Sequence, residues 1–187
     1  MNDRLLLPTV AEALAAHGVA HEVLACLPEL ADTAEFCAHY GFSLEQAANT
    51  ILVASKKVDP PRYAVCVVLG TTRLDVNRSV RALLDVKRAS FADAGTTAAL
   101  TGMLVGGVTA PGIAGLPVYV DRAVMDVPRV VMSGGNRSSK IVLDPAELLK
   151  LPGFRVVDGL ATVPNQSELH EQAQAREQAQ AHEQAEA

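Results

Sequence analysis

A glycine-rich segment between residues 101 and 112 carries the clearest chemical signal in this chain. Five of the thirteen glycines fall between Gly102 and Gly115, and Pro111 stiffens that stretch. Such a density indicates a backbone that adopts positive φ angles or approaches a ligand closely, where a Cβ would collide. A loop of this kind can direct main-chain N–H groups toward an oxyanion, a carboxylate or an acyl carbonyl. A tight connector without any ligand explains the same glycines equally well.

The common motifs of nucleotide binding and covalent catalysis are absent from the sequence. No GxxxxGK[ST] loop is present, no GxGxxG opens a helix, and no GxSxG elbow occurs. Ser133 precedes Gly134 and Gly135, but the predicted folded body has no histidine beyond Tyr40 that could activate this hydroxyl. We therefore expect neither a catalytic triad nor a cofactor.

The cysteines and histidines do not form a metal-binding pattern. Cys26, Cys37 and Cys66 are odd in number and lack CxxC spacing, which favours buried, reduced thiols over a disulfide framework or a zinc site. His17 and His21 are four residues apart, but a glycine between them interrupts any shared helical face. We predict no metal site.

Charge is distributed unevenly along the chain. The net charge is −5, and the segment from Gln166 onward accounts for −4 of it, so the remainder is nearly neutral. Eight basic residues face only three acidic ones between residues 56 and 88: Lys56, Lys57, Arg62, Arg73, Arg78, Arg81, Lys87 and Arg88. This stretch either forms a positive face that meets a phosphate backbone or is a set of solvated surface charges. The absence of Trp and the small number of other rings disfavour a base-stacking platform.

The length and composition predict one α+β domain, residues 1–163, followed by a low-complexity Glu/Gln/Ala tail, residues 164–187, that is a solvated helix or disordered. Capping residues and apolar periodicity predict helices at 8–17, 32–38, 43–49, 75–84, 93–100 and from residue 144. Apolar runs predict strands at 19–26, 50–54, 63–69, 86–90, 117–120, 129–132, 140–143 and 154–157. Because several neighbouring strands lack a crossover helix, we expect a mixed sheet with helices around it. No signal peptide or membrane-spanning run is evident, so we expect a cytoplasmic protein.

Four segments, in this order, resemble the YbaK/ProRS-associated domain family, which is related to the editing insert of bacterial prolyl-tRNA synthetase. They are 46–53 (QAANTILV), 73–76 (RLDV), 101–111 with its GxxxP pattern, and 132–137 (MSGGNR). The resemblance covers roughly residues 8–160. It implies a strongly twisted mixed β-sheet flanked by helices.

The same resemblance implies an activity, namely hydrolysis of the ester that joins a mischarged amino acid to the terminal adenosine of tRNA. The implied partners are the acceptor end of aminoacyl-tRNA and, in addition, an aminoacyl-tRNA synthetase. Amides of the glycine loop would position the substrate carbonyl or a water molecule, and a ribose hydroxyl would assist. Catalytic roles would fall to Asn49, Gly106 and Gly107. The implied substrate-binding residues are Val108, Thr109, Pro111, Ser133, Gly134, Gly135 and Arg137.

Asn49 is the main departure from the family pattern, because the family's characteristic lysine stands at this position. An amide can hydrogen-bond a substrate, but it cannot neutralise a negative charge. Lys56 and Lys57 lie roughly 20 Å further along an extended strand, at about 3.3 Å per residue. Three interpretations remain open: an active trans-editing deacylase, a catalytically idle relative that binds aminoacyl-tRNA or a synthetase, and a pocket for a free small molecule such as an amino acid.

Overall fold

The computed structural model describes residues 2–164, so the predicted tail from residue 165 lies outside the described residues. The α-helices are α1 (Pro8–Ala16), α2 (Thr33–Tyr40), α3 (Arg81–Leu83), α4 (Ala94–Thr101) and α5 (Arg122–Met125). The 3₁₀- and π-helical turns are η1 (Asp3–Leu5), η2 (Pro28–Leu30), η3 (Val76–Val80) and η4 (Pro145–Lys150). The strands are β1 (Glu22–Ala25), β2 (Ala48–Ser55), β3 (Tyr63–Leu69), β4 (Arg73–Leu74), β5 (Ala89–Phe91), β6 (Val118–Asp121), β7 (Val130–Ser133), β8 (Ser139–Leu143), β9 (Phe154–Val157) and β10 (Ala161–Thr162).

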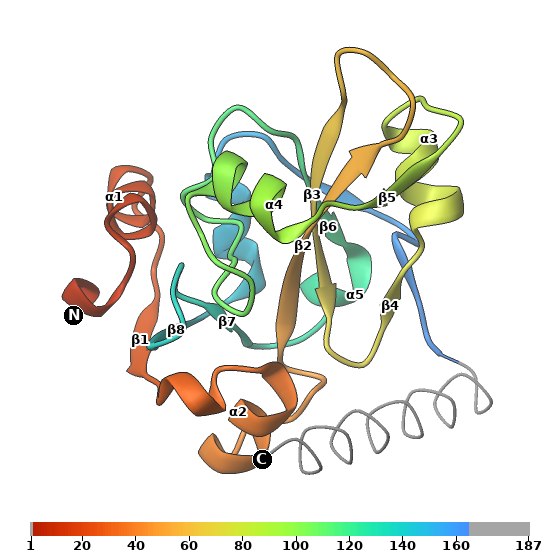
Figure 1. The fold of residues 1–187 in the computed structure, drawn as a ribbon. Helices are drawn as coiled ribbons and strands as arrows, with labels where there is room; N and C mark the ends of the chain where they lie inside the picture. Colours follow the sequence, from red (N-terminus) through yellow and green to blue (C-terminus); the bar gives the residue numbers. More distant parts are fainter. Residues whose placement is uncertain (1, 165–187) are drawn as a thin grey trace, which may run out of the picture.

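A five-stranded mixed sheet in the order β5-β2-β3-β6-β9 forms the centre of the molecule (Figure 1). β6 runs parallel to both β3 and β9, whereas β2 is antiparallel to β3 and β5. The predicted α+β class with a mixed sheet and surrounding helices is thus confirmed. The sequence did not indicate that the remaining strands form separate sheets, β1-β8-β7 and β10-β4.

Alternation along the central strands divides the core between the two faces of this sheet. Val65 and Val67 of β3 pack in one hydrophobic cluster with Leu52 of β2, whereas Cys66 and Val68 pack in a second cluster on the other side. All four β3 side chains are fully or almost fully buried. β3 is therefore a central strand covered on both faces, which explains why it appears in the sequence as a continuous apolar run.

The helices predicted at residues 8–17, 32–38 and 93–100 are present, but the one predicted at 43–49 is wrong. The Ser43 N–H does donate to Gln46 Oε1 at 3.2 Å, as a capping-box spacing suggests. The segment is nevertheless a turn, because Ala47 pairs with Val131 in a parallel bridge and β2 starts at the next residue. Strand pairing with a distant segment outweighs the local helical signal.

The segment 75–84 and the two aspartates that precede helical elements show how local signals act in this fold. The helix predicted at 75–84 is divided into the π-helical turn η3 and the short helix α3. Asp75 caps η3 by accepting from the Arg78 N–H at 3.0 Å, and Asp121 caps α5 by accepting from the Ala123 N–H at the same distance. Both carboxylates therefore cap the helical elements that directly follow them in the chain.

The Ala47–Val131 bridge is also where the five-stranded and three-stranded sheets meet. Beyond it, β2 and β7 diverge, and the segment that follows α4 descends beside them (Figure 1, green). α2 lies across the end of this gap, so α2, β2, β7 and the segment after α4 together enclose one space.

Candidate functional site

A cavity of about 330 Å³ lies where the two sheets diverge. Its walls come from the start of α2, the first half of β2, the residues after β5, one turn of α4, the glycine loop, and strands β7 and β8. This volume is at the small end of the range for ligand pockets. Of the predicted site residues, the cavity is lined by Asn49, Gly106, Val108 and Ser133.

Asn49 lies near the start of β2 and is held by a neighbour on α2. Its Oδ1 accepts a hydrogen bond from Thr33 Oγ1 at 2.6 Å. This orientation leaves the amide nitrogen, with its two donors, without a partner among residues 2–164. Asn49 can therefore donate to a ligand in the cavity.

Lys140, at the second position of β8, is a cavity-lining residue that the sequence analysis missed. It is only 5% exposed. Its Nζ donates to the Ala31 carbonyl at 2.6 Å and to Ser133 Oγ at 3.4 Å, and it lies 5.1 Å from the centroid of the Phe36 ring. An ammonium has three donors, so one N–H remains available to a ligand. The only signal for it in the sequence is a charged residue at the head of an otherwise apolar strand.

The surroundings of Lys140 determine its electrostatics. Burial lowers the pKa of its ammonium, and the thiols of Cys26 and Cys37 and the Asp32 carboxylate partly oppose that shift. The pocket thus contains a poorly solvated cation beside one carboxylate. A negatively charged or strongly polarised oxygen in the cavity would be stabilised there more than in water.

Gly106 has the clearest stereochemical reason to be glycine. Its φ is +87°, and an added Cβ would overlap the Arg137 guanidinium. Its carbonyl accepts from Ser133 Oγ at 3.4 Å, whereas its N–H has no partner within the described part of the chain. Lys140, Ser133 and Gly106 are thereby joined by hydrogen bonds along one wall of the cavity.

The rest of the glycine loop supports this wall from behind. The Gly107 N–H donates to the Leu104 carbonyl at 2.9 Å, and a Cβ at Gly107 would approach the Asn136 backbone to 2.8 Å. Thr109 is fully buried, and its N–H donates to Met103 Sδ at 3.3 Å. Pro111 is also buried. Gly107, Thr109 and Pro111 therefore lie outside the cavity lining.

The turn between β7 and β8 has a similar structural position. Gly134 accepts from the Leu7 N–H at 2.9 Å, and a Cβ on Gly135 would meet the side chains of Leu7 and Val10. Gly135 thus lets α1 approach the turn, whereas a Cβ on Gly134 would collide with Ser139 Oγ. Arg137 lies behind the cavity, where its NH2 donates to the Pro28 carbonyl at 2.9 Å and its NH1 pairs with Asp32 at 3.1 Å.

The three cysteines carry free thiols. Cys26, Cys37 and Cys66 are free and buried, as predicted, and burial raises the pKa of the Cys66 thiol to about 12. Over the range 2–164, no group of three or more His, Cys, Asp or Glu side chains could hold a metal ion. Within the same range, no helix is long and apolar enough to cross a membrane.

Comparisons with solved structures place this fold among known relatives. A hypothetical protein, APE2540, is 26% identical with a TM-score of 0.72, and the match covers 80% of this chain and 97% of that chain. A candidate trans-editing enzyme for prolyl tRNA synthetase is 25% identical with a TM-score of 0.69, covering 82% of this chain and 97% of the other. A scaffold protein used for epitope grafting is 26% identical with a TM-score of 0.68, covering 82% of this chain and 97% of that scaffold.

A family model gives the classification directly. The model of the aminoacyl-tRNA editing domain matches residues 27–151, which is about two thirds of the chain. The matched range includes α2, β2, the glycine loop, β7 and β8, so every wall of the cavity falls inside it. The chain therefore belongs to the aminoacyl-tRNA editing domain family.

Proposed function

We propose that this protein hydrolyses mischarged aminoacyl-tRNA in trans, with the aminoacyl ester bound in the cavity between β2, β7 and the glycine loop. The observation that carries the proposal is the buried ammonium of Lys140, which keeps one donor free at the cavity wall. At position 49 on β2 the family's characteristic lysine would supply a positive charge, but Asn49 supplies none. In our proposal Lys140 provides this charge from β8.

The reaction needs stabilisation of the negative charge that forms on the ester carbonyl oxygen. Water attacks the carbonyl carbon, the bond from that carbon to the ribose oxygen breaks, and the ribose oxygen gains a proton. The products are a free amino acid and tRNA with its terminal ribose hydroxyl restored. In our proposal the Lys140 ammonium and the Gly106 N–H donate to the developing oxyanion, and a vicinal ribose hydroxyl relays the proton.

The pocket geometry supports Gly106 rather than Gly107 as the main-chain donor. The Gly107 N–H is already bonded to Leu104 inside the loop, whereas the Gly106 N–H is unpaired over the described residues and belongs to the cavity lining. Asn49 would use its free amide nitrogen to hold a substrate carbonyl or hydroxyl.

Single-turnover hydrolysis of an aminoacyl-tRNA panel tests this proposal. The panel contains alanyl-, cysteinyl-, seryl- and threonyl-tRNA on cognate and proline tRNAs. We expect wild-type cleavage of at least one substrate and a rate about 100-fold lower in Lys140→Met, the usual scale for removing an oxyanion donor. Lys140→Arg, which keeps the charge, should retain part of the rate.

Lys150→Met is the matched control, because Lys150 lies on η4 and pairs with Glu147 on the surface. Its rate should equal that of the wild type. Equal rates for Lys140→Met and wild type would refute the role of Lys140. Silence from the wild type together with activity in Asn49→Lys would instead identify a binding protein that has lost its catalytic charge.

A further inference from the structure

Four basic side chains surround a shallow depression at the start of β5, outside the cavity lining. Lys56 follows β2, Arg81 begins α3, and Lys87 and Arg88 precede β5. We call these four residues the β5 basic surface. All four are exposed, and none has an ion pair or side-chain hydrogen bond with any other residue in the range 2–164.

The backbone of the β5 basic surface is held in place by contacts on both of its sides. The Lys56 N–H donates to the Arg88 carbonyl at 2.9 Å, which extends the pairing of β2 with β5 by one residue. The Arg62 guanidinium donates to the carbonyls of Leu84 at 2.9 Å and Asp85 at 3.1 Å, and so secures the turn between α3 and β5. The four cations are thus presented by a defined backbone.

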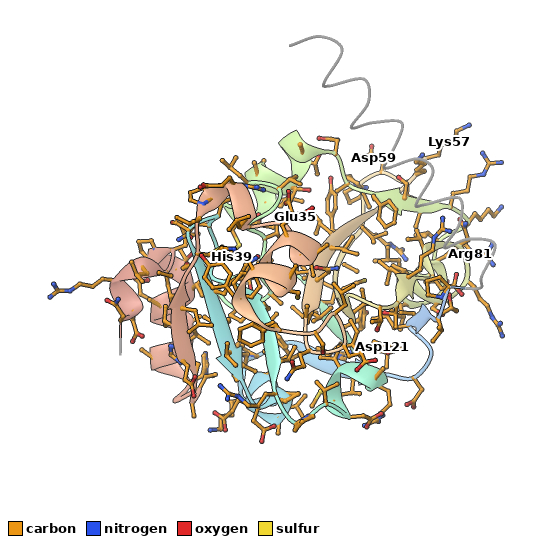
Figure 2. All side chains as sticks on the ribbon, turned by 90° about the horizontal axis from the view of Figure 1, so that it is seen from below. Glu35, His39, Lys57, Asp59, Arg81 and Asp121 are labelled. Carbon is orange, nitrogen blue, oxygen red and sulfur yellow. The ribbon has the colours of Figure 1, made fainter. Side chains whose placement is uncertain are left out.

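β5 leads directly from this surface to the cavity. Phe91 and Ala92 line the cavity, and Arg88 precedes Phe91 by three residues on an extended chain, which is about 10 Å. Phe91 is 59% exposed at the cavity mouth. Arg81 and Lys57 lie on the same side of the molecule, away from Glu35 and His39 of α2 (Figure 2).

We infer that the β5 basic surface binds the backbone phosphates of the acceptor end of tRNA, so that the strand runs along β5 and its aminoacylated terminus enters the cavity. The inference rests on the proposed function. Four cations that have no ion pair among residues 2–164, on a chain with a net charge of −5, indicate local recognition of a polyanion. The two guanidinium groups match phosphate geometry in particular.

The same surface lacks what base recognition would need. Its lining contains no aromatic side chain, and Asn77 is its only amide. Phosphate contacts dominate affinity and carry no sequence information. We therefore expect this surface to contribute salt-dependent affinity that is independent of the nucleotide sequence, while the cavity selects the amino acid.

The first test measures binding of an unacylated acceptor-stem minihelix with a single-stranded 3′ end, by fluorescence anisotropy across a series of salt concentrations. Arg81→Gln/Arg88→Gln should weaken binding at low salt. It should also reduce the slope of log K against log salt by about 1.4, because each phosphate that a cation neutralises on a single strand contributes about 0.7. Arg4→Gln/Arg155→Gln removes the same charge from two exposed arginines elsewhere and should leave the slope unchanged.

The second test separates this inference from the proposed function. Hydrolysis rates are compared for an aminoacylated minihelix and for aminoacyl-adenosine, which lacks the phosphates. The ratio of the two rates should fall at least fivefold in Arg81→Gln/Arg88→Gln, and an unchanged ratio in an active enzyme would overturn the inference while leaving the deacylase intact. If the wild type hydrolyses neither compound, the proposed function fails. The salt slopes of minihelix binding then decide alone whether the β5 basic surface binds phosphates. Poly-glutamate binding as tightly as the minihelix would also overturn the inference, in favour of an acidic protein partner.

Discussion

Lys140 places an ammonium at 5% exposure in a strand whose other residues, 139 and 141–143, are also buried. Removing a charge from water is costly unless hydrogen bonds and nearby charges compensate. The Ala31 carbonyl, Ser133 Oγ and the Phe36 ring supply that compensation only in part, since burial still lowers the Lys140 pKa. Such incomplete compensation is typical of residues kept for chemistry rather than for stability.

The lowered pKa predicts how stability depends on pH. Between the lowered pKa in the folded state and the ordinary value of 10.5, the unfolded chain binds more protons at Lys140 than the folded protein does. The Lys140 contribution to the free energy of unfolding therefore rises with pH in that window and is constant above 10.5.

Urea denaturation of wild type and Lys140→Met at several pH values from neutral to about 10 measures this effect. Because Lys140 lowers the pKa of the Cys26 and Cys37 thiols, both proteins are compared in a Cys26→Ala/Cys37→Ala background, where the difference between the two curves isolates Lys140. The wild type should gain stability relative to the variant as the pH rises. A difference that stays flat with pH would contradict the lowered pKa.

At the scale of elements, the glycine loop, the β7–β8 turn and the start of α2 are held together through Arg137. Its guanidinium bonds to the Pro28 carbonyl and to Asp32, and it also occupies the space beside Gly106 where a Cβ would lie. The position of this cavity wall therefore depends on Gly106 in the loop, which has no side chain, and on the long Arg137 side chain in the turn.

Gly106→Ala should accordingly lower the free energy of unfolding by more than its backbone strain alone. The positive φ contributes about 1–2 kcal/mol, and displacement of the Arg137 guanidinium adds to it. Gly115→Ala is a matched control, because Gly115 has a φ of +75° with open space around its Cβ position. Denaturant unfolding of both variants, alone and combined with Arg137→Ala, gives the coupling.

The expected result is a smaller cost of Gly106→Ala in the Arg137→Ala background and an unchanged cost of Gly115→Ala. Additive costs for Gly106→Ala and Arg137→Ala would show that the two residues do not compete for space.

At the scale of the whole molecule, the described residues form three hydrophobic clusters. All three hydrophobic clusters are formed by side chains between Leu6 and Ala161, and they cover both faces of the central sheet and the back of the β1-β8-β7 sheet. The range of these clusters is the reason to keep the domain boundary near residue 163 as a proposal.

A chain that ends at Pro164 should therefore fold and keep its activity. We expect its Tm to lie within about 3 °C of the full-length value, since roughly 1 kcal/mol corresponds to 2–4 °C in a domain of this size. Thermal unfolding and single-turnover deacylation of the two chains provide the check. A larger decrease in Tm would mean that the segment 165–187 contributes to the folded domain.

The sequence alone determined the features that depend on neighbouring residues. Local patterns account for caps such as Asp75 and Asp121, for the apolar run of β3 and for the family resemblance. They also account for the mixed sheet and for the basic stretch that contains the β5 basic surface. Asn49, Gly106, Val108 and Ser133 were identified through the family resemblance, and they line one cavity.

Only the tertiary structure decided which charges meet there. Lys140 is 91 residues from Asn49 in sequence and joins it because β8 pairs with β7, whose residue Val131 bridges to Ala47 beside β2. Because of the same bridge, residues 43–49, which were predicted as a helix, form a turn and the start of β2. Pairings between distant segments leave no periodic or spacing signal in the chain, and it is these pairings that place a cation on the same cavity wall as Gly106.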